Sequence, residues 1–469
     1  MKIAFLHYHL NPGGVTTVLR HQVSALEGYA ECIVLSGAPP PSRFPCPVYH
    51  LPGIGYDGNE TAAAPPEKTA SAIKTALHNP FSGPCDLLHI HNPILAKNQL
   101  FLDILKFLQQ SGLRLFLQIH DFAEDGRPGA FFRDVDYPAD CHYGVINLRD
   151  YHILINAGLV PEGVHYLPNC VVPFDSAPVS TREPYGLYPV RAIRRKNIGE
   201  ALLLSLFLPQ NNAIYITQPP NSPVDFPSYN HWKSYVQAHH FPVFFEMGTQ
   251  RHFVELVAAA QWVLTTSITE GFGFTFLEPW TAGKLLKGRI LPEICKDFLN
   301  NGIQLSHLYA SIQIPKHWIG VKRIVDRFHA CLAANQEAFG DIWPEEWMED
   351  CLHSLQQSDT IDFGMLDERL QTTIIDHIRL NPAKRNDMLQ LNPVLETMFS
   401  MEKESAIIDW NRDRVVALYH PDRYRERLID IYAQIRKTPV QQCIDKKVLL
   451  DGFLQFYNFS LLKWSTYDG

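Results

Sequence analysis

The feature that most constrains the fold of this chain is an alternation of short apolar runs with helical patterns, which occurs twice. Over residues 2–169, apolar segments of strand length alternate with segments whose apolar residues recur at helical spacing. A second alternation of the same kind covers residues 188–267. Strands that alternate with helices form mostly parallel sheets. The pattern therefore predicts an α/β protein with two doubly wound, Rossmann-like domains that face a cleft.

The expected strands can be placed individually. In the first alternation they are residues 2–8, 31–36, 86–91, 113–120, 143–147 and 164–169, and in the second they are residues 188–193, 212–217, 242–247 and 262–267. Helical spacing is clearest at residues 15–26, 93–110, 198–207 and 252–260.

A segment rich in proline, serine and charged residues separates the two alternations. We expect residues 173–188 to be a linker between an N-terminal domain, residues 1–172, and a C-terminal domain, residues 189–303. Strand signals fade after Ile303, and residues 304–469 are expected to be a helical extension that completes the second domain. The simplest role for this extension is to cover apolar surface, and shaping of an acceptor site or self-association are alternatives.

Length, charge and cysteine usage narrow the class of protein. A chain of 469 residues exceeds the roughly 250–300 residues that one core holds, which agrees with two domains. The net charge of −8 argues against a nucleic-acid partner. The nine cysteines form no CxxC pair and are expected to be reduced thiols of a cytoplasmic protein. No signal-peptide pattern is present and no apolar run reaches the ~20 residues of a membrane span, so membrane contact would be at most peripheral, for example through the basic segment at residues 284–289.

Two glycines follow the first expected strand. Gly13 and Gly14 lie where the chain turns into a helix, and free N–H groups there favour an anion such as a diphosphate. The spacing is not G-x-G-x-x-G, so the dinucleotide fingerprint is absent. An ordinary tight turn is the alternative.

Basic residues follow the strand that opens the second domain. Arg191 and Lys196 are five residues apart, and a guanidinium fork with an ammonium point charge suits phosphate oxygens. Arg194 and Arg195 between them are assigned to a solvated basic turn.

The most specific motif runs from Glu270 to Glu278 and follows the last expected strand. Each end carries a carboxylate that can accept sugar hydroxyls, and the glycine-containing turn between them, Gly271-Phe272-Gly273, can present N–H groups to phosphate. Alternatively, Glu278 is a first-turn helix acid favoured by the helix dipole.

Together these segments resemble glycosyltransferase family 4, the retaining enzymes of the GT-B fold. The resemblance spans roughly residues 1–300 and rests on landmarks that occur in the right order. They are Gly13-Gly14, His120-Asp121, the LPNCV segment at 167–171, the Arg-x4-Lys spacing of Arg191 and Lys196, the two glutamates Glu270 and Glu278, and the Gly-Lys and Pro-Glu-Ile stretch at 282–294. The stretch between Gly283 and Pro292 is shorter than is usual in this family, and the helical extension exceeds the family's tail.

The resemblance implies roles for the matching residues. Arg191 and Lys196 would neutralise the diphosphate of a nucleotide-sugar donor, with the backbone at Gly13-Gly14 nearby. Glu270 would bind sugar hydroxyls, Glu278 would bind the ribose, and His120 would lie near the anomeric carbon. No cofactor is implied.

Two further patterns are weaker. Asp134-Val-Asp136 fits the DxD metal motif of another glycosyltransferase fold, but such tripeptides are common by chance and no metal site is predicted. The pairs His7-x-His9 and His89-x-His91 each place two imidazoles on one face near a strand end, where no further ligand completes a metal site. We expect His89, His91 and Asn92 to line the acceptor side instead.

The sequence therefore predicts a metal-independent, retaining glycosyltransferase that moves a sugar from a nucleoside diphosphate to an acceptor hydroxyl. The alternatives are another GT-B enzyme, such as a sugar-nucleotide epimerase or a phosphorylase, and a non-catalytic nucleotide-sugar-binding scaffold.

Overall fold

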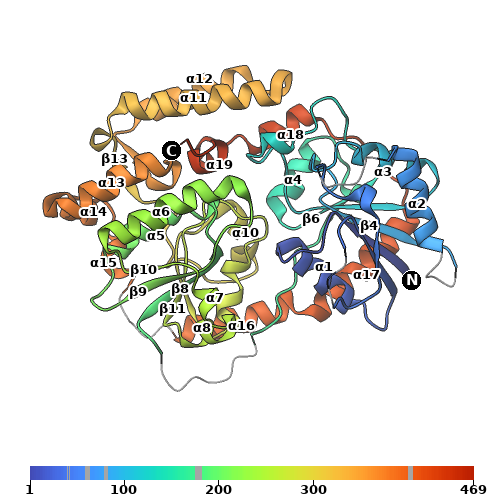
Figure 1. The fold of residues 1–469 in the computed structure, drawn as a ribbon, viewed down its shortest axis with the longest axis horizontal. Coiled ribbons are helices and arrows are strands. Elements are labelled where there is room, and N and C mark those ends of the chain that lie inside the picture. The colour runs from blue at the N-terminus through green and yellow to red at the C-terminus, as the bar shows by residue number, and fades with distance from the viewer. Residues whose placement is uncertain are drawn as a thin grey trace. The chain divides into compact units, whose positions relative to one another are not determined.

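The computed structural model describes residues 1–39, 41, 43–58, 64–78, 83–174, 182–399 and 405–468. The chain divides into two compact units, each built around a parallel sheet (Figure 1). Unit 1 comprises Met1–Cys170, Ala338–Trp343 and Leu418–Phe453, and unit 2 comprises Val171–Glu337, Pro344–Ala417 and Leu454–Gly469.

Unit 1 has a seven-stranded sheet with the order β3-β2-β1-β4-β5-β6-β7, in which every pairing is parallel. The order reverses between β1 and β4, which makes that point the topological switch. The strands are β1 (Lys2–His7), β2 (Glu31–Ser36), β3 (Val48–His50), β4 (Leu87–His91), β5 (Leu115–Ile119), β6 (His142–Val145) and β7 (Val164–Tyr166). The main helices are α1 (Gly14–Ala25), α2 (Pro66–His78), α3 (Phe101–Gln110), α4 (Leu148–Asn156), α17 (Pro421–Lys437) and α18 (Lys446–Phe453).

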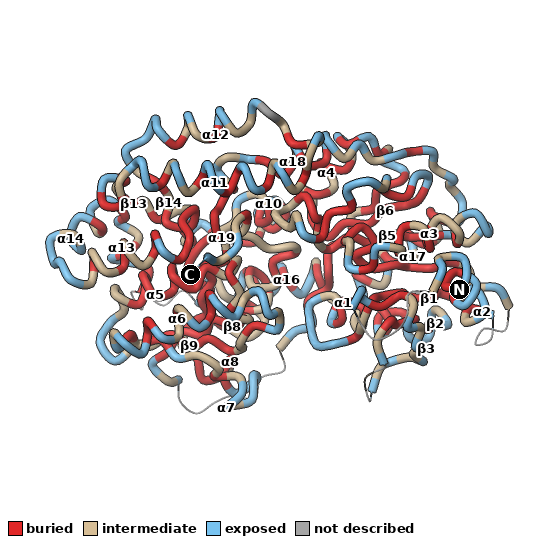
Figure 2. Tube along the Cα trace, turned by 45° about the horizontal axis from the view of Figure 1, so that its top comes forward, coloured by how far each residue is buried: buried red, intermediate tan, exposed pale blue. Residues whose placement is uncertain are grey.

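The sheet of unit 1 buries both of its faces. Successive strand side chains point to opposite faces, so Ala4 and Leu6 join one core while Ile3 and Phe5 join the other. Helices α2, α3, α4 and α18 contribute to the first core, and α1 and α17 contribute to the second. Coverage on both faces explains why central strands such as β4 and β5 are buried at every position; the chain around the β5 label in Figure 2 is mostly red.

Unit 2 has a five-stranded parallel sheet with the order β10-β9-β8-β11-β12, whose switch point lies between β8 and β11. Its strands are β8 (Tyr185–Arg191), β9 (Ala213–Gln218), β10 (Val243–Phe244), β11 (Trp262–Thr265) and β12 (Leu285–Gly288), and a small antiparallel pair is formed by β13 (Gln313–Pro315) and β14 (Thr360–Asp362). The helices that belong mainly to this unit are α5 (Ile198–Ser205), α6 (Phe226–His239), α7 (Met247–Gln250), α8 (Phe253–Ala259), α9 (Glu278–Thr281), α10 (Pro292–Asn300), α11 (Val321–Phe339), α12 (Glu345–Gln357), α13 (Glu368–Leu380), α14 (Pro382–Leu391), α15 (Val394–Thr397), α16 (Ser405–Tyr419) and α19 (Leu461–Trp464).

Two doubly wound parallel sheets confirm the predicted α/β class, and each of the ten expected strands has a counterpart. Strands β3, β12, β13 and β14 were not among the expected strands, because they have only three or four residues and show no readable alternation. The helix expected at residues 93–110 begins only at Phe101. The side chain of Asn98 donates to the carbonyls of Gly53 and Gly55 and accepts from the N–H of Leu100, which holds the preceding segment in turns.

The compact units divide the chain differently from the expected domains. Residues 418–453 were expected in the extension of the second domain but belong to unit 1, where α17 packs against α1 (Figure 1). Strand β8 begins at Tyr185, inside the expected linker of residues 173–188, and residues 175–181 of that linker lie outside the described residues.

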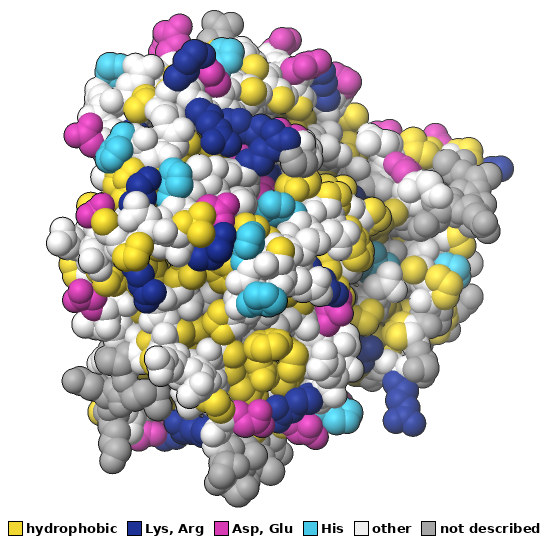
Figure 3. Space-filling model, turned by 60° about the vertical axis from the view of Figure 1, so that its left-hand side comes forward, with side chains coloured by type: hydrophobic (Ala, Val, Ile, Leu, Met, Phe, Trp, Pro, Cys, Tyr) yellow, Lys and Arg dark blue, Asp and Glu magenta, His cyan; other side chains and the backbone are white. Residues whose placement is uncertain are grey.

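The surface carries charges of both signs. On the face drawn in Figure 3, basic side chains gather in small groups with acidic side chains and histidines around them. Among the residues that the structure describes, no helix combines the length and apolarity needed to cross a bilayer. All nine cysteines are free thiols.

Candidate functional site

The candidate site of unit 2 is built at the switch point of its sheet. Strands β8 and β11 are neighbours, and their carboxyl ends lead into the segments that carry Lys196 and Glu270. In open α/β sheets, ligands bind outside the carboxyl ends of the strands at this point.

The site centres on an ion pair between the Lys196 ammonium and the Glu270 carboxylate. Each side chain is only 13% exposed. Burial lowers the pKa of Lys196, and attraction to Glu270 opposes that effect only in part. Burial alone would raise the pKa of Glu270, but the charge and hydrogen bond of Lys196 bring it below its usual value. The two groups therefore hold each other in the ionised state.

The backbone around Lys196 is fixed by several hydrogen bonds. The Tyr188 hydroxyl donates to the Lys196 carbonyl at 2.6 Å, and the Thr266 hydroxyl donates to the carbonyls of Lys196 and Asn197 at 3.0 Å each. Asn197 is in the left-handed conformation, with φ of 50°, and its amide contacts Glu200 and Gln371 at 2.8 Å. Sequence reasoning missed these positioning residues, although an asparagine directly after Lys196 is a signal for a left-handed turn.

The arginines near Lys196 have different surroundings. Arg191 is half-buried at the end of β8, and within the described ranges its guanidinium has no hydrogen bond or ion pair. Arg194 was assigned to a solvated turn, but it is 8% exposed and forms a bidentate pair with Glu368 at 2.8 and 2.9 Å. Arg191 is therefore available to an anion, whereas Arg194 has a structural role.

The glycine turn after Glu270 packs closely. Gly273 has a φ of 91°, and a Cβ there would lie 2.9 Å from the Phe276 ring, so a side chain is excluded. Phe272 is buried and packs against Phe274 and Phe298. The turn leads to Glu278, the first residue of α9, which is also the position of a first-turn helix acid. Burial raises the pKa of Glu278 to about 7, and in the described part of the chain its carboxylate has no hydrogen-bond partner.

In unit 1, Gly13 and Gly14 lie at the switch point between β1 and β4. Gly13 precedes the first residue of α1, and a Cβ built on Gly14 would meet no described heavy atom within 4 Å. Open space beside a helix N-terminus at a switch point leaves room for a ligand.

His120 lies at the carboxyl end of β5 and is 6% exposed. Its Nε2 is 2.8 Å from Nδ1 of His91, and one proton is shared between the two rings. Burial lowers the pKa of His120 to about 4, so the imidazole is neutral at pH 7. Its Nδ1 has no hydrogen bond within the described residues.

Two of the expected acceptor-side residues have other roles. His89 is fully buried, and its two ring nitrogens bond to the Tyr432 hydroxyl at 2.9 Å and to Gln118 at 2.8 Å, so it cannot also contact an acceptor. Asn92 accepts hydrogen bonds from the N–H groups of His120 and Asp121 at 2.7 and 3.1 Å and thereby positions the His-Asp step. His91 is also fully buried, behind His120.

Metal ligands do not cluster in the described part of the chain, where no group of three or more His, Cys, Asp or Glu side chains could hold an ion. Burial lowers the pKa of the Lys446 ammonium, and the charges of Glu124, Asp136 and Asp134 oppose that effect only in part.

Comparisons with solved structures define the class of fold. Sucrose-phosphate synthase from Thermosynechococcus elongatus superimposes with a TM-score of 0.52 at 14% identity, covering 92% of this chain and 98% of that chain. Anabaena HepE in complex with UDP superimposes with a TM-score of 0.51 at 12% identity, covering 92% and 99%. The chain therefore has the GT-B fold of these glycosyltransferases.

A protein of known activity is similar to this chain over most of its length. Mannosylglucosyl-3-phosphoglycerate synthase from Petrotoga mobilis is 26% identical over 446 residues, covering 86% of each chain. The sequence matches no family model.

Proposed function

We propose that this protein is a retaining, metal-independent glycosyltransferase of family 4 that uses a nucleoside-diphosphate sugar as donor. The observation that carries the proposal is the Lys196–Glu270 pair at the switch point of the unit 2 sheet, with Arg191, which has no ion pair among the described residues, at the end of β8.

The pair suits both halves of a donor. An ammonium has three N–H donors, so Lys196 can bind Glu270 and still donate to a diphosphate. A carboxylate accepts at about four positions, so Glu270 can receive sugar hydroxyls while it holds Lys196. Arg191 would add a second cation to the departing diphosphate, whose charge grows in the transition state. Glu278 would accept from the ribose.

Unit 1 would supply the acceptor side and His120. A neutral imidazole can accept a hydrogen bond at Nδ1 without adding charge near the reacting carbon. Retention would follow from front-side attack, in which Glu270 acts as a ligand for sugar hydroxyls and not as a nucleophile.

The acceptor proposal starts from the curated relative, whose name describes a mannosyl-glucosyl derivative of 3-phosphoglycerate. We propose a phosphorylated glycoside of that kind as the acceptor of this protein. The exposed Lys97 near Arg127, at the carboxyl edge of the unit 1 sheet, is compatible with an anionic acceptor.

The first experiment is a thermal-shift panel with UDP, GDP, ADP and their sugar conjugates, with and without EDTA. A ligand at about 100 times its Kd stabilises a protein by about 2.7 kcal/mol. The donor that shifts the transition is then incubated with glucosyl-3-phosphoglycerate, and the product is identified by mass spectrometry and its anomer by NMR.

Variants test the site assignment. Lys196→Ala and Glu270→Ala should each lower kcat/KM by about 100-fold or more, because each removes a charged contact to the donor. Lys322→Ala is the matched control, since it breaks a solvent-exposed pair with Asp326. Activity near wild type in both site variants would exclude this site. Turnover that requires phosphate or no acceptor would indicate a phosphorylase or an epimerase, and tight donor binding without turnover would indicate a scaffold.

A further inference from the structure

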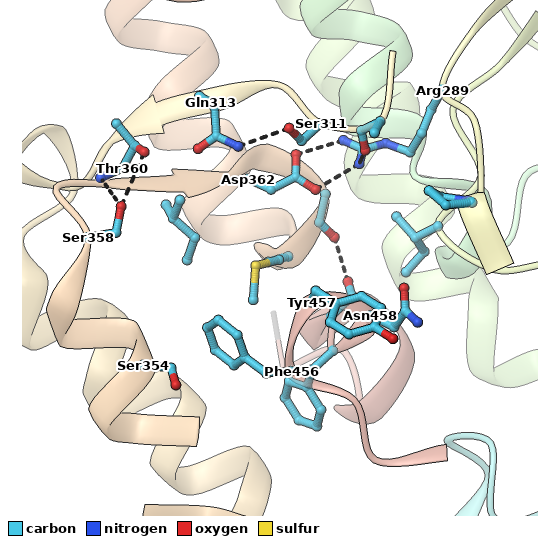
Figure 4. A pocket seen from close by; sticks show the side chains of 18 of the residues that line it. Arg289, Ser311, Gln313, Ser354, Ser358, Thr360, Asp362, Phe456, Tyr457 and Asn458 are labelled. Carbon is cyan, nitrogen blue, oxygen red and sulfur yellow. Dashed lines mark hydrogen bonds and ion pairs between the residues drawn. The ribbon is translucent and has the colours of Figure 1, made fainter. Parts of the chain in front are cut away.

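Unit 2 contains a pocket that is not lined by Arg191, Lys196, Glu270 or Glu278. It has a volume of about 350 Å³, within the ~300–1,000 Å³ range of small-molecule sites. Ile268 and three distant segments line it: the residues after β12, parts of the stretch from Ala310 through α12 to Met365, and residues 456–460 near the C-terminus (Figure 4).

The two cationic side chains that line this pocket already have hydrogen-bond partners. Arg289 uses all five of its N–H donors: it pairs with Glu200 at 2.9 and 2.6 Å and with Asp362 at 2.7 and 2.9 Å, and it donates to the Ala310 carbonyl at 2.8 Å. Lys316 is 3% exposed and donates to the carbonyls of Leu355 and Ser358. Within the described residues, Arg289 therefore has two carboxylate partners and no spare N–H, and the Lys316 ammonium is almost fully buried against backbone carbonyls.

The neutral polar groups, in contrast, have hydrogen-bond donors and acceptors that are not in use among the described residues. The hydroxyl of Ser354 and the amide of Asn458 have no hydrogen bonds within the described ranges. Gln313 donates to the Ser311 hydroxyl at 2.9 Å, which leaves its carbonyl oxygen to accept. In Figure 4, Asn458 and Tyr457 lie on one side of the pocket and Ser354 and Ser358 on the other. These groups can donate and accept on both sides of a bound molecule.

Aromatic and aliphatic walls complete the lining. Tyr457 is 64% exposed, and Phe456, the next aromatic side chain of the lining, precedes it in the chain. Flat aromatic faces next to hydroxyls and amides, without a free charge, match the alternating C–H faces and O–H edges of a sugar ring.

We propose that this pocket binds an uncharged saccharide. Ile268, two residues before Glu270, and the segment after β12 both line it, so it lies on the same edge of the sheet as the Lys196–Glu270 pair. A saccharide held there would occupy a site that the donor does not need, and the inference does not depend on the donor proposal.

Methionine NMR provides a direct readout because Met365 lines the pocket. The protein is labelled with ¹³C-methyl methionine, the Met365 signal is assigned with Met365→Leu, and mannose, glucose, mannobiose and maltose are titrated. We expect at least one of these sugars to shift the Met365 signal saturably. The signals of Met247 and Met388, which do not line the pocket, should not shift.

Variants and charged ligands complete the test. Tyr457→Ala and Asn458→Ala should each weaken saccharide binding about tenfold, which corresponds to a loss of about 1.4 kcal/mol of binding free energy. Tyr29→Ala, which removes another exposed tyrosine, should leave the affinity unchanged. The proposal is overturned if no sugar shifts Met365, if the variants bind as wild type, or if inorganic phosphate or UDP shifts Met365 at lower concentration than every sugar.

Discussion

At the scale of single residues, the site depends on carboxylates and imidazoles whose protonation is set by burial. Glu278 is an acid and His120 is a base, so burial shifts their pKa values in opposite directions. Burial raises the pKa of Glu278 to about 7 and lowers the pKa of His120 to about 4, and in each case it favours the uncharged form. For Glu278, this shift predicts a pH dependence of donor binding that can be measured.

Glu278 predicts a pH-dependent donor affinity. If Glu278 binds the ribose as proposed, its ionised carboxylate is the form that accepts the hydroxyls. Donor binding should then be complete above the pKa of about 7 and weaken as the pH falls below it, by up to about tenfold per pH unit. Calorimetric titration of the donor from pH 6 to 8 measures this effect. Glu278→Gln should bind more weakly at pH 8 and show a flat profile, and an unchanged slope in this variant would exclude Glu278 as the titrating group.

His89 predicts acid lability of unit 1. Its pKa falls from 6.5 to about 3 on burial, so the unfolded chain binds more protons between these values. The stabilisation from a neutral His89 is complete above pH 6.5 and is lost as the pH falls, by about 2 kcal/mol at pH 5. Urea unfolding at pH 7 and pH 5 should show a smaller pH effect in His89→Gln than in wild type, with the exposed His329→Gln as control.

At the scale of elements, α17 is the helix whose placement matters most. Although it lies near the end of the chain, Tyr424 and Tyr432 from its buried face reach the polar groups beneath the unit 1 sheet. The Tyr424 hydroxyl accepts from Gln22 of α1 at 2.8 Å, and the Tyr432 hydroxyl contacts His89 of β4 at 2.9 Å. The helix therefore takes part in the hydrogen bonding of the core as well as in its apolar packing.

Removing one of these hydroxyls tests the docking of α17. Tyr432→Phe leaves a buried ring nitrogen of His89 without its partner, which should lower the free energy of unfolding of unit 1 by about 1–3 kcal/mol. Tyr29→Phe, at an exposed tyrosine, should have no effect. Hydrogen exchange of β4 amides measures the change within unit 1, and equal protection in both variants would contradict a structural role for this bond.

At the scale of the whole molecule, the sequence predicted the two sheets but not which distant segments pack against them. Local periodicity revealed every strand of five residues or more, because the repeat of apolar residues lies within the strand itself. The contact between His89 and Tyr432 joins residues 343 positions apart, and no local pattern encodes it. Arg194 was assigned to a solvated turn for the same reason. Its partner, Glu368, lies far along the chain, and no local pattern reveals it.

The residues proposed for the donor site could be selected from the sequence, whereas those of the saccharide pocket could not. Arg191 ends β8, and Lys196 and Glu270 follow the ends of β8 and β11, which are neighbours in a parallel sheet, so a local pattern points to one edge of that sheet. The saccharide pocket combines three segments, and the neutralisation of Arg289 depends on Glu200 and Asp362 from two different elements. Only the folded chain brings those charges together.

The placement of α17 has a consequence for how the protein is made. Met1–Cys170 is synthesised long before Pro421–Lys437. Until α17 is made, the core between α1 and the first sheet lacks its cover at Leu19 and Val23 of α1 and at Phe116 of β5. N-terminal domains commonly complete their folding during synthesis. Here the first sheet emerges earliest and is completed last, so the nascent chain carries an exposed apolar face through most of its translation.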